Sequence, residues 1–397
     1  MFCLLLCAYA HPAAAQFKFD ASAAALEQYD SNVFRLSSSG QAYDPVSAKF
    51  DDKRDDSILN GVATARLEYK FDDQRIYLNG DGTRQWYHHY KVLDHDEYNA
   101  GGGFDWRATD WVDGSASAHQ DHRMVPQSAR LLPTLTVAMQ KDQNASGGIN
   151  FTAGKLWRLE TRFDWQKQDA PSPDAQFFMN ERDYTVAGKY LGLGPAAVGL
   201  QVQYIDGVFT APVLPPNTVV TPANYRTFAL GTSPYHQYNE DLTVDYTVSS
   251  LSSFTTKLGV SQRRDPQGVQ PPTNGFTGEL QYKRTISPLT TLTFALQRKL
   301  QSYPSFNDFV VESGGYGQLE WRPTLKIYTN LLAQYLEDSF HSADRADRLA
   351  LVDAGVAYQV FEHFSIKPGF HYEDRRSSGG VYSYVDRIYS MEAKLIF

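Results

Sequence analysis

The chain has 397 residues, of which 42% are hydrophobic and 14% aromatic, and 37 basic against 45 acidic side chains give it a net charge of −8. This composition is too hydrophobic and too aromatic for a disordered chain, and its acidity argues against nucleic acid as a partner, which would require a basic surface. The mean hydropathy is −0.44. A membrane-spanning helix needs an apolar run of about 18 residues, and no run in the sequence is that long, so a helical membrane protein is excluded as well.

The N-terminal segment predicts export. It opens with the apolar stretch MFCLLLCAY and places three alanines before Gln16, which matches the core and cleavage site of a secretory signal peptide, although the usual basic start is missing. We therefore predict a signal peptide over residues 1–15 and a mature chain over 16–397. Both cysteines, Cys3 and Cys7, fall in the signal, so the mature chain offers no disulfide, thiolate zinc site or cysteine nucleophile.

Apolar and polar residues alternate with a period of two along the mature chain. In residues 157–165, WRLETRFDW, the odd positions are apolar or threonine and the even positions are charged. Successive side chains of a strand point to opposite faces, so this stretch predicts a strand with one apolar and one polar face. The same alternation recurs in residues 241–247, 254–261, 276–283, 364–373 and 389–397.

Short and long connections also alternate, and together they predict 18 strands. Short turns are predicted near residues 71–74, 108–110, 153–155, 192–196, 248–252, 287–289, 323–325 and 361–363. Longer polar segments rich in Asp, Ser, Pro and Gly lie between them, for example residues 30–56, 124–141, 169–179, 209–235 and 265–273. Both termini are then expected at the end of the fold that holds the short turns.

These regularities predict an all-β fold, a transmembrane antiparallel β-barrel of about 18 strands. A soluble β-sandwich also alternates apolar and polar residues, but it has no reason to sort its connections by length. A barrel of the bacterial outer membrane has short periplasmic turns and long extracellular loops. It must close on itself, because lipid offers no hydrogen-bond partner to free backbone groups. We expect the apolar strand faces to contact outer-membrane lipid.

The positions of aromatic residues agree with a barrel. Tryptophans gather near predicted strand ends, as at Trp106, Trp157, Trp165 and Trp321, where amphipathic rings form the girdles of barrels. The chain ends on Phe397, with hydrophobic residues at every second position before it. This ending resembles the C-terminal signal that the bacterial barrel assembly machinery reads, so we expect that machinery to be a partner.

The polar strand faces predict a wet lumen, because a barrel of about 16–18 strands is too wide for side chains to fill. Charges of both signs on these faces suit a hydrated and weakly selective path rather than a one-sided ion filter. The alternative is that the charges pair across strands for stability alone. The candidate lumen residues are Arg158, Glu160, Arg162, Asp164, Lys257, Glu279, Lys283, Lys326, Lys367 and Glu373.

Two charged clusters resemble cation sites but lack the required spacing. Residues 86–97 combine His, Asp and Glu without a specific zinc pattern, and residues 51–56, DDKRDD, lack the ligand order of an EF-hand. Both are interpreted as polar loops. Gly101, Gly102 and Gly103 are interpreted as a place of bending or close backbone contact in a strand. We predict no cofactor and no metal.

A short motif follows the first predicted strand, and its residues are Asp30, Asn32, Val33, Phe34, Arg35 and Leu36 within DSNVFRL. An Asp-rich segment follows at residues 51–56, and the stretch HYEDRRSS at 371–378 precedes the last strand. With these features the chain resembles the outer-membrane proteins of exopolysaccharide biosynthesis operons, the EpsL type. The similarity extends over the mature chain, but its specific residues are few.

The resemblance implies an outer-membrane pore that exports a polysaccharide chain received from a periplasmic polysaccharide-export protein, with no catalytic residues. Two alternatives stay open. A general diffusion porin would fold a long loop into the pore, either 124–141 or 209–235, and a barrel enzyme would hold a Ser–His or paired-carboxylate site. The motif itself is expected to brace the barrel mouth or meet a partner, or simply to pack its apolar residues on the rim.

Overall fold

The computed structural model describes residues 16–173, 175–213, 220–266, 272–303, 308–340, 345–378 and 382–397, so the predicted signal peptide lies outside the described residues. One antiparallel sheet of 18 strands dominates them. Its strands are β1 (Gln16–Asp30), β4 (Asp56–Phe71), β5 (Gln74–Tyr87), β6 (His95–Thr109), β7 (Val112–Met124), β8 (Met139–Ala153), β9 (Trp157–Ala170), β10 (Phe177–Leu193), β11 (Ala196–Pro212), β12 (Leu230–Ser249), β13 (Ser252–Arg264), β14 (Thr273–Ser287), β15 (Thr290–Tyr303), β16 (Asp308–Thr324), β17 (Ile327–Phe340), β18 (Ala346–Phe361), β19 (Phe364–Ser377) and β20 (Tyr384–Ile396).

Smaller elements occur only in the loops of the described chain. The first long loop holds a hairpin of β2 (Ala42–Asp44) and β3 (Lys49–Asp51), and two 3-10 helices, η1 (Lys91–Leu93) and η2 (Gln127–Ala129), lie in later loops. Within the described residues, no helix combines the length and apolar character needed to cross a membrane.

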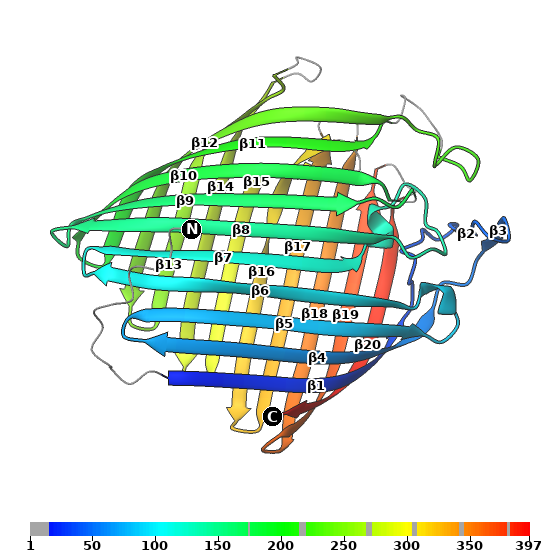
Figure 1. Ribbon diagram of the computed structural model, residues 1–397, viewed down its shortest axis with the longest axis horizontal. Helices are drawn as coiled ribbons and strands as arrows, with labels where there is room; N and C mark the ends of the chain where they lie inside the picture. The colour runs from blue at the N-terminus through cyan, green and yellow to red at the C-terminus, as the bar shows by residue number, and fades with distance from the viewer. Residues whose placement is uncertain are drawn as a thin grey trace, which may run out of the picture.

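The sheet closes into a barrel (Figure 1). Each strand pairs antiparallel with its neighbours in the chain, and β1 pairs with β20 through nine residue pairs from Ser22–Ile396 to Asp30–Ile388. On its other side β1 pairs with β4 over its whole length. Every strand of the 18-stranded sheet therefore has two partners, as lipid requires. The predicted 18-stranded antiparallel barrel is confirmed.

The connections sort by length at the two ends of the barrel. Tight turns such as residues 71–74, 153–157 and 361–364 lie at one end, here called the short-turn end, together with the start of β1 and the end of β20. The other end, the long-loop end, carries segments such as 31–55 and 125–138 (Figure 1). The turns fall where the sequence predicted them, because period-two alternation stops wherever the chain reverses.

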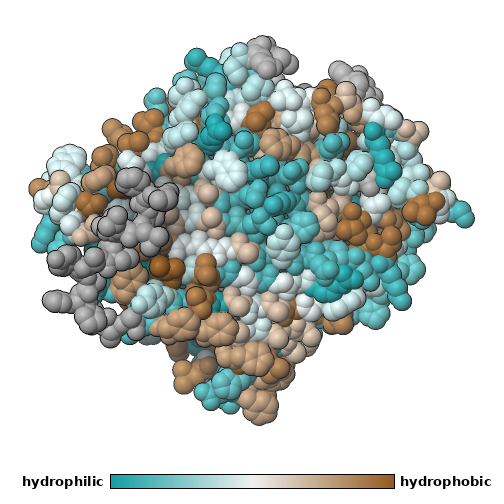
Figure 2. All heavy atoms as spheres, viewed as in Figure 1, coloured by the Kyte–Doolittle hydropathy of each residue, from teal (hydrophilic) through white to brown (hydrophobic). Residues whose placement is uncertain are grey.

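The outer face of the barrel is apolar, as the alternation requires. Large side chains such as Leu200 stand 69% exposed on it, and Figure 2 shows hydrophobic residues gathered mostly over the half of this face toward the short turns. Aromatic pairs mark this surface, for example Trp157 with Tyr190, whose ring centroids lie 4.8 Å apart. Such a surface is stable only against lipid, because soluble monomers rarely expose large apolar patches.

A second aromatic row crosses the outer face nearer the long loops. The rings of Phe163, Tyr184, Tyr204 and Tyr238 follow one another across β9–β12 at centroid distances of 5.1, 6.3 and 4.9 Å. Two residues further toward the long loops, the outward position of β10 is Arg182. The row therefore marks the boundary at which the lipid-facing band gives way to a polar rim.

A glycine in β13 offers a test of the strand packing. A Cβ on Gly259 would overlap the backbone carbonyl of Glu240 and lie 2.9 Å from the Cα of Asp241, whereas a Cβ on Gly188 would meet nothing within 4 Å. We expect Gly259→Ala to destabilise the barrel by about 1–3 kcal/mol, the usual cost of overpacking. Gly188→Ala should be neutral or slightly stabilising. Urea unfolding in vesicles measures both variants, and equal midpoints would contradict this packing.

Candidate functional site

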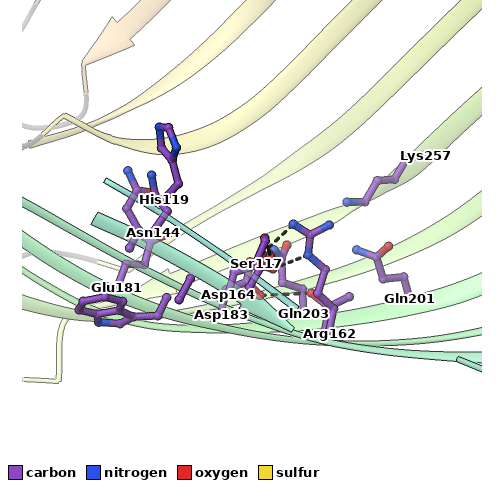
Figure 3. A pocket seen from close by; sticks show the side chains of 15 residues that line it. Ser117, His119, Asn144, Arg162, Asp164, Glu181, Asp183, Gln201, Gln203 and Lys257 are labelled. Carbon is purple, nitrogen blue, oxygen red and sulfur yellow. Dashed lines mark hydrogen bonds and ion pairs between the residues drawn. The ribbon is translucent and has the colours of Figure 1, made fainter. Parts of the chain in front are cut away.

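A polar hollow of about 580 Å³ lies on the inner wall of the barrel (Figure 3). Inward positions of β7 to β11 and of β13 line it, because polar residues occupy every second place on these strands. Its side chains include Ser117, His119, Asn144, Arg162, Asp164, Glu181, Asp183, Gln201, Gln203 and Lys257. Both charge signs and several amides therefore face one water-accessible space.

Side chains of this wall bond to one another rather than standing free. Arg162 donates from Nε to one oxygen of Asp164 at 2.6 Å and from Nη2 to the other at 2.7 Å (Figure 3). The Gln203 amide donates to Asp183 and accepts a 2.6 Å hydrogen bond from Asn239. These bonds hold the polar groups in fixed places and keep most charges balanced locally.

A second hollow of about 330 Å³ adjoins the first, and Lys257 lines both. Its Nζ lies 3.5 Å from the carboxylate of Asp241. Glu279 also lines the second hollow. Because one lysine stands between two water-accessible spaces, its charge is well placed to influence any ion that passes along this wall.

Ion pairs continue along the wall toward the short turns. Arg158 bridges Glu160 at 3.0 Å and Asp113 at 3.3 Å, and Lys189 reaches the other oxygen of Glu160 at 3.2 Å. Among the other candidates, Glu373 accepts a 2.6 Å hydrogen bond from the hydroxyl of Tyr384. Lys283 and Lys367 occupy inward register positions of β14 and β19.

Lys326 does not lie on the lumen wall, so this part of the prediction is wrong. It is exposed in the tight turn between β16 and β17, where its backbone N–H donates to Oγ1 of Thr324 at 3.2 Å. The alternation of the neighbouring strands does not continue through residues 325–326, where the chain reverses. Inside a turn the period of two has no meaning, because the backbone is no longer pleated.

The DSNVFRL motif lies at the long-loop end, where β1 meets β20. Arg35 forms ion pairs of 3.0 Å with Asp30 at the end of β1 and with Asp386 in β20. Ser31 strengthens the same junction, because its backbone N–H donates to the carbonyl of Arg387 at 3.0 Å. Burial alone would lower the pKa of Arg35, but the two carboxylates outweigh burial and raise this pKa above its ordinary value.

Asn32 shapes the rest of the motif. Its Nδ2 donates to the carbonyl of Leu36 at 2.9 Å and to that of Val385 at 3.0 Å, and its Oδ1 accepts the Leu36 N–H at 2.9 Å. An aspartate in this place lacks the amide donors for the two carbonyls. The loop is thereby folded back over the rim instead of extending into solvent.

The apolar residues of the motif are buried in the rim. Val33, Phe34 and Leu36 are 7%, 0% and 3% exposed, and the ring of Phe34 meets that of Tyr90 edge-on at 4.8 Å. They belong to a cluster, here called the rim cluster, of Val33, Phe34, Leu36, Ala42, Ile58, Tyr87, Tyr90, Leu93 and Leu135. The motif therefore packs on the barrel mouth.

Long loops meet over the mouth. The backbone of Tyr43 in β2 donates to the carbonyl of Pro133 at 2.9 Å and accepts from the N–H of Leu135 at 2.9 Å, which joins loops 31–55 and 125–138. The ring of Tyr43 also lies 6.2 Å from that of Tyr225 in the loop between β11 and β12. Pattern reasoning identified these loops by length but gave no signal for which of them touch.

A further network of the inner wall had no signal in the sequence. The Tyr235 hydroxyl contacts Glu181 and accepts from Ser302 at 2.9 Å, and the guanidinium of Arg263 lies 3.5 Å from the centre of the Tyr235 ring. Arg263 also bonds Ser302 at 3.2 Å. Glu181, Arg263 and Ser302 of this network, from β10, β13 and β15, also line a third hollow of about 290 Å³.

The charged loop 86–97 is held by internal bonds. The Nδ1 of His95 lies 2.6 Å from the carbonyl of Leu93, and Asp94 accepts the backbone N–H of Tyr87 at 2.8 Å. Across the described part of the chain, no three His, Cys, Asp or Glu side chains are grouped as a metal site would need. The glycines of β6 allow close contact, since a Cβ on Gly103 would lie 2.5 Å from the Tyr77 hydroxyl.

Comparison with known proteins finds similarity only among solved structures. No protein-family model matches the sequence, and no curated protein matches it. Similar solved structures include Pseudomonas aeruginosa OccK1 (OpdK), 10% identical with a TM-score of 0.45 over 96% of this chain and 99% of that one. The ferric-catecholate import receptor Fiu from Escherichia coli K12 is 10% identical, with a TM-score of 0.48 over 96% and 81%. The siderophore receptor PirA from Acinetobacter baumannii is 7% identical, with a TM-score of 0.44 over 95% and 80%.

The strand pairing and the distribution of side chains place this chain in the bacterial outer membrane. A closed antiparallel barrel with an apolar belt, aromatic rows, short turns at one end and long loops at the other is the architecture of that membrane. The short-turn end is then periplasmic and the long-loop end extracellular, as the sequence predicted.

Proposed function

We propose that the chain is a water-filled channel through which small hydrophilic solutes cross the outer membrane by diffusion. The observation that carries this proposal is the inner wall, where hollows of about 580 and 330 Å³ adjoin and are lined by amides, hydroxyls and locally paired charges. A closed barrel of 18 strands leaves an interior that side chains do not fill. Paired charges favour weak rather than strict ion selectivity.

Planar-bilayer recording tests the channel directly. Purified folded barrel added to one chamber should produce stepwise, ohmic conductance with similar permeability for potassium and chloride. Heat-denatured protein from the same preparation is the control. A folded barrel that inserts without producing conductance steps would contradict the proposal.

Reversing the charge of Lys257 should shift the selectivity toward cations. Lys257→Glu replaces a positive charge between the two hollows by a negative one and leaves Asp241 without its partner at 3.5 Å. A change of two charge units at about 8 Å from the path amounts in water to about 1 kcal/mol, of opposite sign for potassium and chloride, so the two ions differ by about 2 kcal/mol. Salt at roughly 0.1–0.15 M screens this difference to less than about half, so the potassium-to-chloride permeability ratio should rise about threefold to fivefold. The reversal potential under a salt gradient measures this ratio.

Lys326→Glu is the matched control for Lys257→Glu. It makes the same charge change, but Lys326 is exposed in a turn outside the lumen. Its permeability ratio should stay close to that of the unchanged protein at an ionic strength that screens distant charges. Equal shifts in the two variants would show that ions do not follow the wall at Lys257.

Export of a secreted polysaccharide is the second candidate function. It is favoured by the resemblance of residues 30–36 and 371–378 to the exopolysaccharide outer-membrane proteins and by the amides of the lumen, which can bond sugar hydroxyls in either direction. Amides line all three hollows, namely Asn144, Gln166, Gln168, Gln201, Gln203, Gln237, Gln281, Gln297 and Gln301. A periplasmic polysaccharide-export protein would deliver the polymer to the short-turn end.

Deletion of the gene separates the two candidates. If the barrel exports polysaccharide, the deletion strain should lose secreted polymer, and the unchanged gene should restore it. Normal polymer secretion combined with channel conductance in bilayers would leave the diffusion channel as the function and remove export.

A further inference from the structure

A separate pocket of about 430 Å³ lies between the loops at the extracellular mouth. Residues 35–41 and 127–133 form its two main walls, and Val220, Tyr382 and Tyr384 complete it. The backbone bonds of Tyr43 to the loop of Pro133 hold the two walls together. The pocket has the size of a small-molecule site, and it is distinct from the three hollows of the inner wall.

The polar groups of this pocket fall into two sets. Its two cations already have partners, since Arg35 pairs with Asp30 and Asp386, and Arg130 donates to the carbonyls of Val125 and Thr136. The other set is neutral. Gln127 in this set already donates to the carbonyl of Thr134 at 3.0 Å. The side chains of Ser37, Ser39, Gln41 and Ser128 line the pocket and make no hydrogen bond to any described residue.

Apolar surface accompanies the unused neutral groups. Leu131, Leu132 and Tyr382 line the pocket with partly exposed side chains, whereas Leu36 and Tyr384, which also line it, are buried. A fitting ligand must therefore offer several neutral hydrogen-bonding groups and one apolar face, and it needs no charge. A pyranose ring has this combination, because its hydroxyls lie around the edge and its C–H groups form the faces.

We propose that the mouth pocket binds one sugar residue of a neutral glycan. Gln41, Ser37, Ser39 and Ser128 bond its hydroxyls, and the partly exposed Leu131, Leu132 and Tyr382 pack against its C–H face. This inference depends on the proposed function in one respect, namely that glycans or their fragments reach the extracellular mouth. Binding itself requires no conduction, so the two can be tested apart.

Calorimetric titration of the detergent-solubilised full barrel tests the site. The probes are linear hexasaccharides of glucose, of galactose and of N-acetylglucosamine. At least one should bind with a saturable 1:1 isotherm. The double variant Gln41→Ala/Ser128→Ala removes two neutral hydrogen-bonding groups. Its affinity for that probe should fall by about tenfold or more.

The matched control is Gln16→Ala/Ser253→Ala, which makes the same chemical changes at exposed positions of the short-turn end. It should bind like the unchanged barrel. Heat-modifiable gel mobility confirms that each variant is folded, and the single variant Ser39→Ala, at an exposed position, provides a second test. We expect Ser39→Ala to weaken binding about threefold or more.

Two results would overturn the proposal. One is the absence of saturable binding of all three hexasaccharides to the unchanged barrel, and the other is equal binding by the pocket variants. Conductance measured on the same preparation keeps the outcomes apart. Binding without conductance would support the pocket and contradict the channel. Conductance without binding would support the channel and contradict the pocket.

Discussion

Arg35→Met is expected to weaken the junction of β1 and β20 by about 3–5 kcal/mol, the cost of removing one partner from a buried ion pair. The Arg35 side chain is 18% exposed, and its partners Asp30 and Asp386 are 7% and 0% exposed. Methionine keeps the apolar stem but leaves two carboxylates together without a cation. Hydrogen exchange at the backbone N–H of Ser31, which bonds Arg387, should therefore become faster by about a hundredfold or more.

Two further variants control this result. Arg348→Met breaks a surface pair with Glu337, in which the side chains are 61% and 39% exposed, and should cost less than about 1 kcal/mol. Combining Arg35→Met with Asp386→Asn removes one of the stranded charges and should recover part of the lost protection. Unchanged exchange at Ser31 in Arg35→Met would show that the ion pairs do not hold the junction.

The same junction should respond to pH. Asp30 lies at the long-loop end beyond the lipid-facing band, and burial raises its pKa to about 6, with Arg35 opposing this shift and Asp386 adding to it. The folded state therefore binds a proton more readily than the unfolded state, so this group's contribution to stability is greatest below about pH 4 and is lost as the pH rises through about 6. In Arg35→Met the exchange defect should be largest above pH 6 and smaller below it, after correction for intrinsic exchange rates.

Phe34→Ala is expected to release the first long loop from the barrel mouth. Phe34 is fully buried in the rim cluster against Tyr90, and truncating a buried phenylalanine costs about 3–5 kcal/mol. The loop is a local unit, so the loss should appear as local opening while the strands stay paired. The backbone N–H of Leu36, which Asn32 accepts, should exchange about a hundredfold faster or more.

Phe50→Ala is the control for this truncation. Phe50 belongs to the same loop, and its ring centroid lies 5.4 Å from that of Tyr43, but its side chain is 51% exposed. Its removal should change the exchange of Leu36 by less than about fivefold. If both phenylalanine variants leave Leu36 equally protected, the rim cluster does not fix the loop.

The barrel itself was predictable because two simple physical rules act along its whole length. A membrane strand must alternate apolar and polar side chains, and a turn interrupts that alternation, so residues such as 71–74 and 361–364 were recognisable as turns. The same rule failed at Lys326 because it was applied inside a turn. The local pattern therefore predicts where the strands lie and which face each side chain occupies. It does not predict the direction of side chains in the turns, where the backbone is no longer pleated.

The mouth was not predictable, because its contacts join distant parts of the chain. Arg35 meets Asp386, and Tyr43 meets Pro133, without any periodicity in the intervening loops. The motif at residues 30–36 resembles that of the exopolysaccharide outer-membrane proteins, and its apolar residues predict packing on the rim. The sequence alone did not indicate that Asn32 and Arg35 would reach β20, since closure of a sheet depends on all the strands between.

The paired carboxylates of Asp30 and Asp386 come from the first and the last strand, with Arg35 between them. During biogenesis this trio has its full set of partners only after the final strand has been inserted beside the first. In a barrel that lacks its last strand, Arg35 can pair only with Asp30, and its loop is less firmly held. The trio thus distinguishes a completed barrel from an incomplete one, and it does so at the long-loop end, on the cell surface.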